Sequence, residues 1–212
     1  MQITKYEHAC VVIEEQGKRL VIDPGSLTRD MSFLRDVVAV VFTHSHFDHF
    51  SAEQLAAILA ANPTAQVFGT SEVAAAAENV SVTIVQPETE SSAGPFRLGW
   101  YGGRHAFVTS DKPQAENLGV LVNGALYHPG DSLALPGNLH PKVLALPLSG
   151  PWVKTGEAIA FLQAVRPEIC FPTHDIFHSA DGQEVAENWV VAACKETGTT
   201  FEPLRPGESL EV

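Results

Sequence analysis

Residues 37–50 constrain this chain most, because a continuous apolar run leads directly into a cluster of histidines. The run VVAVVF at 37–42 is typical of a strand buried on both faces. The following THSHFDHF places His44, His46, Asp48 and His49 within six residues. Imidazoles this close repel one another when charged and lose hydrogen-bond partners when buried. A bound cation removes both costs, since imidazole nitrogen and carboxylate oxygen donate lone pairs, and we favour it over a solvated His-rich loop.

The spacing within this cluster divides it into two parts. His44 and His46 alternate, so in extended backbone they face the same way and can bind one ion together. Asp48 and His49 follow as the chain turns toward a helix, and they can serve a second ion. Ser51 and Gln54 form an S-x-x-Q capping box that predicts a helix to about residue 61, ended by Asn62-Pro63.

Two histidines do not complete a metal site, so further ligands must come from distant sequence. His105 follows a glycine pair, Asp131 lies in the turn of YHPGDS, and His174 follows the short apolar strand of CFPTH. Each of the three comes at the end of a predicted strand, as the histidine cluster does. This shared position predicts a single site.

The rest of the chain alternates between β-rich and βαβ segments. A hairpin is predicted around the turn at 16–18, and strands near 66–69, 80–85, 96–101, 105–108, 117–122, 125–128, 143–146, 169–172, 199–203 and 209–212. Helices are predicted near 71–78, 155–165 and 181–196, and 86–95 is predicted to be a polar loop. The pattern indicates an α/β (α+β) fold in four layers, an αββα sandwich of two mixed sheets flanked by helices. No linker divides it, so residues 1–212 are expected to form one domain.

Composition narrows the class of partner. The net charge of −12 is unsuited to binding nucleic acid or anionic membranes, which leaves a small-molecule substrate, with a homo-oligomer left open. Cys10, Cys170 and Cys194 are widely spaced and are expected to be reduced core residues. The N-terminus lacks the apolar core of a signal peptide and no run reaches bilayer length, so we expect a cytoplasmic protein.

These motifs resemble the metallo-β-lactamase superfamily of metallohydrolases along nearly the whole chain. The matching features, in the family's order, are THSHFDH at 43–49, His105, GDS at 130–132 and PTH at 172–174. The resemblance implies an αββα fold with a metal centre at one edge of the sandwich. It implies one ion held by His44, His46 and His105, a second held by Asp48, His49 and His174, and Asp131 bridging the two.

Within the superfamily the chain looks most like a branch related to ascorbate-6-phosphate lactonase. YEHACVVIEEQGKRLVIDPG at 6–25 and LPLSGPWVKTGEAIAFLQAVRPEICFPTHD at 146–175 carry this resemblance. Two departures are that Ser132 stands where Thr is commoner and Asp175 where a Tyr often follows the histidine.

The implied activity is metal-dependent hydrolysis of a small-molecule ester, lactone, thioester or phosphoester. Two divalent ions sharing a hydroxide would supply the nucleophile, and Asp48 is the candidate catalytic residue that orients it or takes its proton. We expect zinc, and the ligand types also suit iron or manganese.

Other residues and functions are weaker candidates. Five residues are candidates for a position near the metal ligands or the substrate, and for each the alternative is an ordinary structural role. They are His8, Asp23, His128, Trp152 and His178. Asp23 is expected to hydrogen-bond a ligand imidazole. The alternative functions are a phosphodiesterase or ribonuclease, which would need a basic face, and a non-catalytic metal-binding scaffold, which predicts missing ligands.

Overall fold

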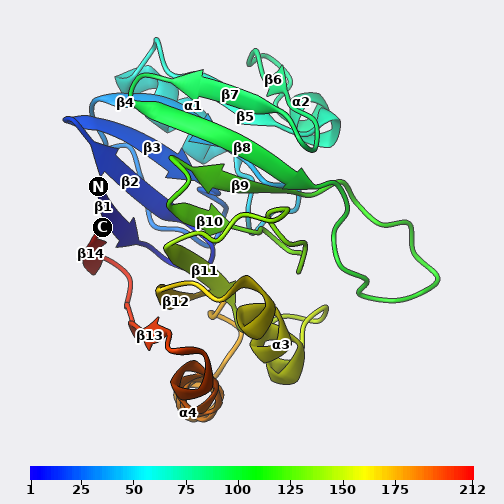
Figure 1. Cartoon of the computed structure of the whole chain (residues 1–212). Coiled ribbons are helices and arrows are strands. Elements are labelled where there is room, and N and C mark those ends of the chain that lie inside the picture. The colour runs from blue at the N-terminus through cyan, green and yellow to red at the C-terminus, as the bar shows by residue number, and fades with distance from the viewer.

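The computed structural model describes residues 1–212 and contains two seven-stranded sheets that face each other (Figure 1). The first sheet has the order β14-β1-β2-β3-β4-β5-β6 and the second β13-β12-β11-β10-β9-β8-β7. The first comprises β1 (Gln2–Lys5), β2 (Val11–Glu15), β3 (Lys18–Ile22), β4 (Val37–Val41), β5 (Gln66–Gly69), β6 (Thr83–Ile84) and β14 (Ser209–Glu211). The second comprises β7 (Glu90–Ala93), β8 (Phe96–Gly102), β9 (Leu118–Val122), β10 (Leu126–His128), β11 (Val143–Pro147), β12 (Ile169–Thr173) and β13 (Thr200–Phe201).

Helices cover the outer face of each sheet. Helices α1 (Ala52–Ala61) and α2 (Ser71–Ala76) bury Leu55, Ile58 and Val73 in a cluster with the first sheet. Helices α3 (Thr155–Val165) and α4 (Ala180–Thr197) pack in the same way on the second sheet. The four layers confirm the predicted αββα sandwich.

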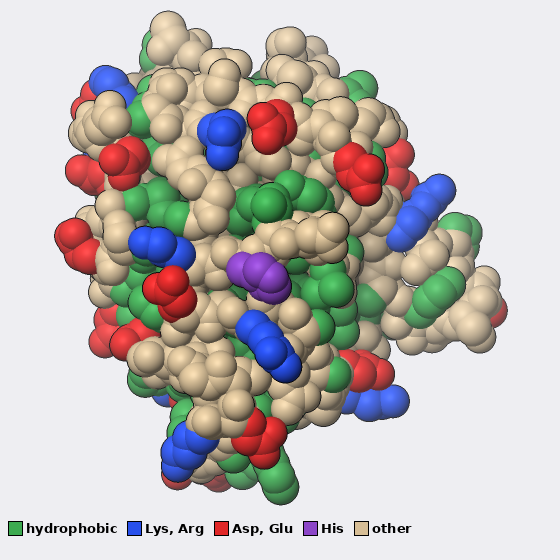
Figure 2. Space-filling view, viewed as in Figure 1, with side chains coloured by type: hydrophobic (Ala, Val, Ile, Leu, Met, Phe, Trp, Pro, Cys, Tyr) green, Lys and Arg blue, Asp and Glu red, His purple; other side chains and the backbone are tan.

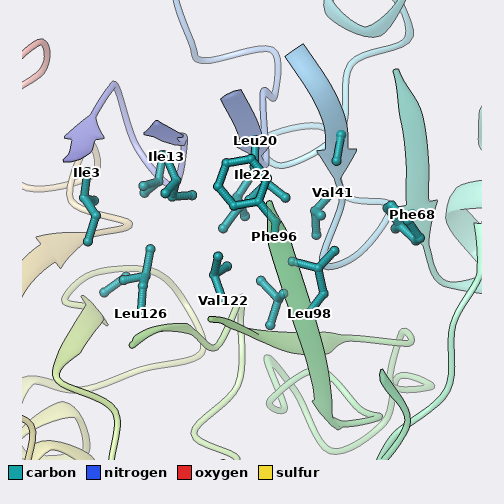
Figure 3. Close-up of a cluster of buried hydrophobic side chains, with 14 of the residues drawn as sticks. Ile3, Ile13, Leu20, Ile22, Val41, Phe68, Phe96, Leu98, Val122 and Leu126 are labelled. Atoms are coloured by element: carbon teal, nitrogen blue, oxygen red, sulfur yellow. The ribbon is translucent and has the colours of Figure 1, made fainter. Parts of the chain in front are cut away.

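The main core lies between the sheets and follows from strand alternation. Leu20 and Ile22 of β3 point into it, whereas Val21 between them packs toward the helices. Figure 3 shows side chains of the first sheet meeting those of the second across this layer. The labelled members are Ile3, Ile13, Leu20, Ile22, Val41 and Phe68 on one side and Phe96, Leu98, Val122 and Leu126 on the other.

Strand direction positions the site. Strands β1, β3 and β4 run the same way, because β2 pairs antiparallel with β1 and β3 while β3 and β4 are parallel. By the same reasoning β8, β10 and β12 share one direction in the second sheet. The segments that follow these strands carry every predicted metal ligand, so strand direction explains why residues distant in sequence reach one edge.

Several predicted elements differ in the structure. The strand predicted at 105–108 is instead part of a loop between β8 and β9, because Gly102 (φ +91°) and Gly103 (φ +128°) turn the backbone out of the sheet. The predicted polar loop at 86–95 contains the edge strand β7, where Glu90 and Ser92 are exposed while Ala93 is buried. The strand predicted at 80–85 is limited to Thr83–Ile84.

The predicted capping box at α1 is half formed. Ser51 accepts a hydrogen bond from the backbone of Gln54, but the Gln54 side chain donates to the carbonyls of Thr28 and Arg29 instead. The three cysteines are free and buried, as predicted. No helix has the length and apolar character needed to cross a membrane.

Candidate metal centre

The structure brings all seven predicted ligands together in two adjacent groups at the edge of the sandwich. In each group the ligand atoms lie within 4.8 Å of one another. The first contains His44, His46, His105 and Asp131, and the second contains Asp48, His49 and His174 together with His8. Every member except His46 is buried.

In the first group, Nδ1 of two imidazoles is hydrogen-bonded outside the centre, so that Nε2 faces the centre. Nδ1 of His44 lies 3.1 Å from Oγ1 of Thr43, and Nδ1 of His105 lies 2.5 Å from the carbonyl oxygen of Ala106. Such contacts set the tautomer and the ring orientation of a metal ligand. His46 lies edge-on to both rings, with centroid distances of 4.7 Å.

In the second group, Asp48 lies between two histidines. Its Oδ2 is 3.1 Å from Nε2 of His8 and 3.6 Å from Nε2 of His174. The His8 and His174 ring centroids are 4.0 Å apart. Burial acts to raise the pKa of Asp48, but the neighbouring imidazole of His174 and the hydrogen bond with His8 hold it well below its ordinary value, so the carboxylate is ionised.

Asp131 lies between the two groups and contacts members of both. Its Oδ2 is 3.2 Å from Nε2 of His105 and 3.1 Å from Nε2 of His174, and its Oδ1 is 2.9 Å from Nε2 of His49. Burial would raise the pKa of Asp131, but the charges of His49 and His174 keep it well below its usual range. One carboxylate is thus placed to serve two ions.

Buried polar atoms without hydrogen-bond partners show that these residues fit bound cations. They are Nε2 of His44, His49 and His174 and Oδ1 of Asp131, none of which forms an aligned hydrogen bond. Nε2 of His49 and of His174 do lie 2.9 Å and 3.1 Å from oxygens of Asp131, which is the crowding expected of ligands that converge on one position. Each buried donor or acceptor left unpaired costs about 1–3 kcal/mol. A cation would be coordinated by these lone pairs, and a set of imidazole and carboxylate ligands suits zinc, iron or manganese.

Asp23 connects the end of β3 to the metal loop, residues 43–50. Its carboxylate accepts hydrogen bonds from the backbone and hydroxyl of Thr43, both 2.7 Å, and lies 2.7 Å from Nδ1 of His49. Burial lowers the pKa of His49, but the carboxylates of Asp131 and Asp23 raise it well above its ordinary value. Asp23 therefore orients His49 toward the centre.

Comparisons with known proteins agree with this architecture. The model of the beta-lactamase superfamily domain matches residues 2–174. The chain belongs to the metallo-β-lactamase superfamily. A Mycobacterium tuberculosis protein is 31% identical to this superfamily member over 190 residues, covering 87% of this chain and 89% of the relative. A UPF0173 metal-dependent hydrolase of Aeropyrum pernix is 28% identical over 239 residues, covering 99% of this chain and 97% of the relative.

A solved structure shares the fold of this metallo-β-lactamase superfamily protein. Igni18, described as a novel metallo hydrolase of the archaeon Ignicoccus hospitalis, superposes with a TM-score of 0.75 at 20% identity, covering 100% of this chain and 98% of Igni18. The likeness to Igni18 shows the fold, and the Aeropyrum pernix relative is named a metal-dependent hydrolase. Assignment to the lactonase-related branch stays a prediction.

The structure separates the weaker candidates. His8 lies among the ligands, whereas His128 is held by backbone groups, with Nε2 2.9 Å from the carbonyl oxygen of Ala9. Trp152 lies edge-on to the rings of His105 and His174, with centroid distances of 5.8 Å and 5.5 Å. His178 belongs to neither ligand group and lines a neighbouring cavity.

Sequence reasoning missed two features. One is the buried ion pair between Lys5 and Asp175, 3.2 Å, which joins β1 to the segment after His174. The other is the apolar surround formed partly by Phe47 and Phe177. Asp175 and Phe177 are within three residues of His174, so their position beside a predicted ligand was the available signal.

Proposed function

We propose that this protein is a dinuclear hydrolase, with zinc as the expected metal, that cleaves a small-molecule ester, lactone, thioester or phosphoester. The observation that carries the proposal is the position of Asp131, whose two carboxylate oxygens contact histidines of both ligand groups. A lone ion would need only one of these groups.

His44, His46 and His105 would hold one ion, Asp48, His49 and His174 the other, and Asp131 both. Two such cations supply Lewis-acid activation of water and of the bond to be cleaved. The ionised carboxylate of Asp48 accepts a hydrogen bond from an approaching water and orients it. Asp23 keeps His49 oriented, and the burial of every ligand except His46 limits access by bulk solvent.

The test combines metal analysis with hydrolysis assays. Purified protein should bind two metal ions per chain and hydrolyse members of a panel of esters, lactones, thioesters and phosphodiesters. Asp131→Asn should lower both metal content and turnover, and removing the metal with a chelator should abolish turnover. His140→Ala is the matched control, because His140 is exposed and belongs to neither ligand group. Full hydrolysis by metal-free protein would refute the proposal.

A small-molecule substrate fits the composition better than nucleic acid does. The net charge of −12 would repel a phosphate backbone, so single-stranded RNA should not bind in a filter assay at low salt. The phosphodiesterase and ribonuclease alternatives predict retention of RNA in the same assay.

A further inference from the structure

A cavity of about 290 Å³ opens directly onto the two ligand groups, and its non-ligand lining is apolar. It is bounded by ligands of both groups and by Phe47, Val108, Pro151, Trp152 and Phe177. No lysine or arginine lines it. A ligand entering this cavity meets the metal-binding atoms on one side and hydrocarbon on the other.

Three of the apolar lining residues are largely exposed to solvent. Phe47 is 62% exposed, Phe177 52% and Val108 49%. They come from three separate segments: the metal loop, the segment after His174, and the loop between β8 and β9. Exposed apolar groups that gather at one place commonly mark a binding site, whereas single ones do not. We call these three residues the apolar rim.

The apolar rim continues into a second cavity of about 770 Å³. Phe47, Pro151 and Phe177 line both cavities, and Leu148 and Val153 extend the apolar lining of the second. Its one cationic residue, Lys154, points largely to solvent, with a side chain 87% exposed and 3.8 Å from Glu157. The two cavities together offer room for a reacting group at the metals and a body several carbons long beyond it.

The loop between β8 and β9 contributes the third side of the rim. It carries Phe107 (59% exposed) as well as Val108, and it contains His105. Figure 2, in the orientation of Figure 1, shows hydrophobic side chains on the lobe that this loop forms at the right of the view. The same loop therefore supplies both a predicted metal ligand and apolar surface.

We propose that the substrate is an uncharged ester, lactone or thioester whose carbonyl carries an aliphatic or aromatic body, and that the apolar rim binds this body. The proposal rests on the proposed function and narrows it. A substrate with an anionic tail fits poorly, because no lysine or arginine lines the cavity at the ligand groups and the chain carries a net charge of −12.

The reaction balances without any further reactant. The oxygen of water bonds to the carbonyl carbon, and the bond from that carbon to the leaving oxygen or sulfur breaks. One proton of water goes to the leaving atom, and the products are a carboxylic acid and an alcohol or thiol. A lactone gives one hydroxy acid.

Binding can be tested without turnover by using hydroxamic acids, which chelate divalent metals and are not hydrolysed by this route. The ligands are a linear series from acetohydroxamic to octanohydroxamic acid, and a matched one of octanoyl length whose chain ends in a carboxylate. Calorimetric titration of the metal-loaded full-length protein should show the dissociation constant falling about two- to four-fold per added methylene. The carboxylate-ended ligand should bind at least ten-fold more weakly than its uncharged match.

Variants test the rim itself. Phe47→Ala and Phe177→Ala should each weaken octanohydroxamic acid about ten-fold and leave acetohydroxamic acid nearly unchanged. Phe33→Ala is the matched control, because Phe33 is 53% exposed and lines neither cavity, and it should change neither constant. Metal content and melting temperature of each variant should match those of the parent, since the side chains removed are exposed.

The outcomes separate this proposal from the proposed function. Affinity independent of chain length, tighter binding of the carboxylate-ended ligand, or no binding of any hydroxamic acid would overturn the apolar-substrate proposal. Asp131-dependent hydrolysis of a charged phosphodiester alone would leave a hydrolase with a different substrate. If binding depends on chain length but the protein hydrolyses nothing in the panel, the apolar rim is supported as a binding site and the proposed hydrolase function is refuted.

Discussion

Gly25 offers the sharpest test of how the fold holds the metal loop. It lies two residues after Asp23, and a Cβ atom at this position would lie 2.0 Å from the carbonyl oxygen of Asp48 and 2.6 Å from the backbone nitrogen of His49. Ordinary contact of a Cβ atom begins at 3.4 Å. Gly25→Ala therefore requires the loop to shift by about 1.4 Å, the difference between 3.4 and 2.0 Å.

The size of the effect follows from what the loop carries. The clash is with backbone, which cannot rotate away, so overpacking should cost about 1–3 kcal/mol of the free energy of unfolding. For a chain of this length that lowers the melting temperature by roughly 2–12 °C. Displacing Asp48 and His49 by more than 1 Å should also weaken metal binding at the second group about 100-fold, the upper range for disturbed ligand support.

The assay compares Gly25→Ala with Gly156→Ala. Gly156 lies in the first turn of α3, where a Cβ atom would meet nothing within 4 Å. Calorimetry gives the melting temperature, and mass spectrometry of dialysed protein gives metal ions per chain. Gly156→Ala should keep both, while Gly25→Ala should lose stability and metal. If Gly25→Ala keeps the metal stoichiometry and melting temperature of the parent, the close approach of Gly25 to the metal loop is wrong.

Three further predictions concern residues around the centre. Lys5→Met leaves the buried carboxylate of Asp175 unpaired and should cost about 3–5 kcal/mol in urea unfolding; a loss below 1 kcal/mol would mean the pair is not buried in solution. Asp23→Asn removes an acceptor of His49 and should lower metal affinity about 10- to 100-fold in chelator competition, and unchanged affinity would contradict the orienting role. Burial lowers the pKa of His128 below 6.5, so this neutral ring adds stability that is complete above pH 6.5 and is lost as pH falls through its folded pKa. The stability difference between metal-free parent and His128→Gln should therefore shrink on acidification below pH 6.5, and a constant difference from pH 8 to 5 would argue against this.

The strongest sequence patterns located the core elements well. The run at 37–42 predicted an interior strand, and β4 is one, because β-branched residues without polar alternation suit burial on both faces. The polar edge strand β7 was missed, since an edge strand needs few apolar side chains. The strand predicted at 105–108 was wrong because neighbouring glycines, not side-chain alternation, determined the backbone there.

Residue types and their positions after strands were enough to select His44, His46, Asp48, His49, His105, Asp131 and His174 as candidate ligands. Spacing also paired His44 with His46 and set Asp48 and His49 apart from them, as the two groups have it. Which distant ligand joins each pair could not be worked out from spacing, because that depends on how two sheets face each other. Tertiary structure alone placed His8 beside Asp48 and gathered Phe47, Val108 and Phe177 around the ligands. A sequence pattern records where a strand ends, whereas proximity between such ends depends on strand direction and sheet packing, which bring together residues more than a hundred positions apart.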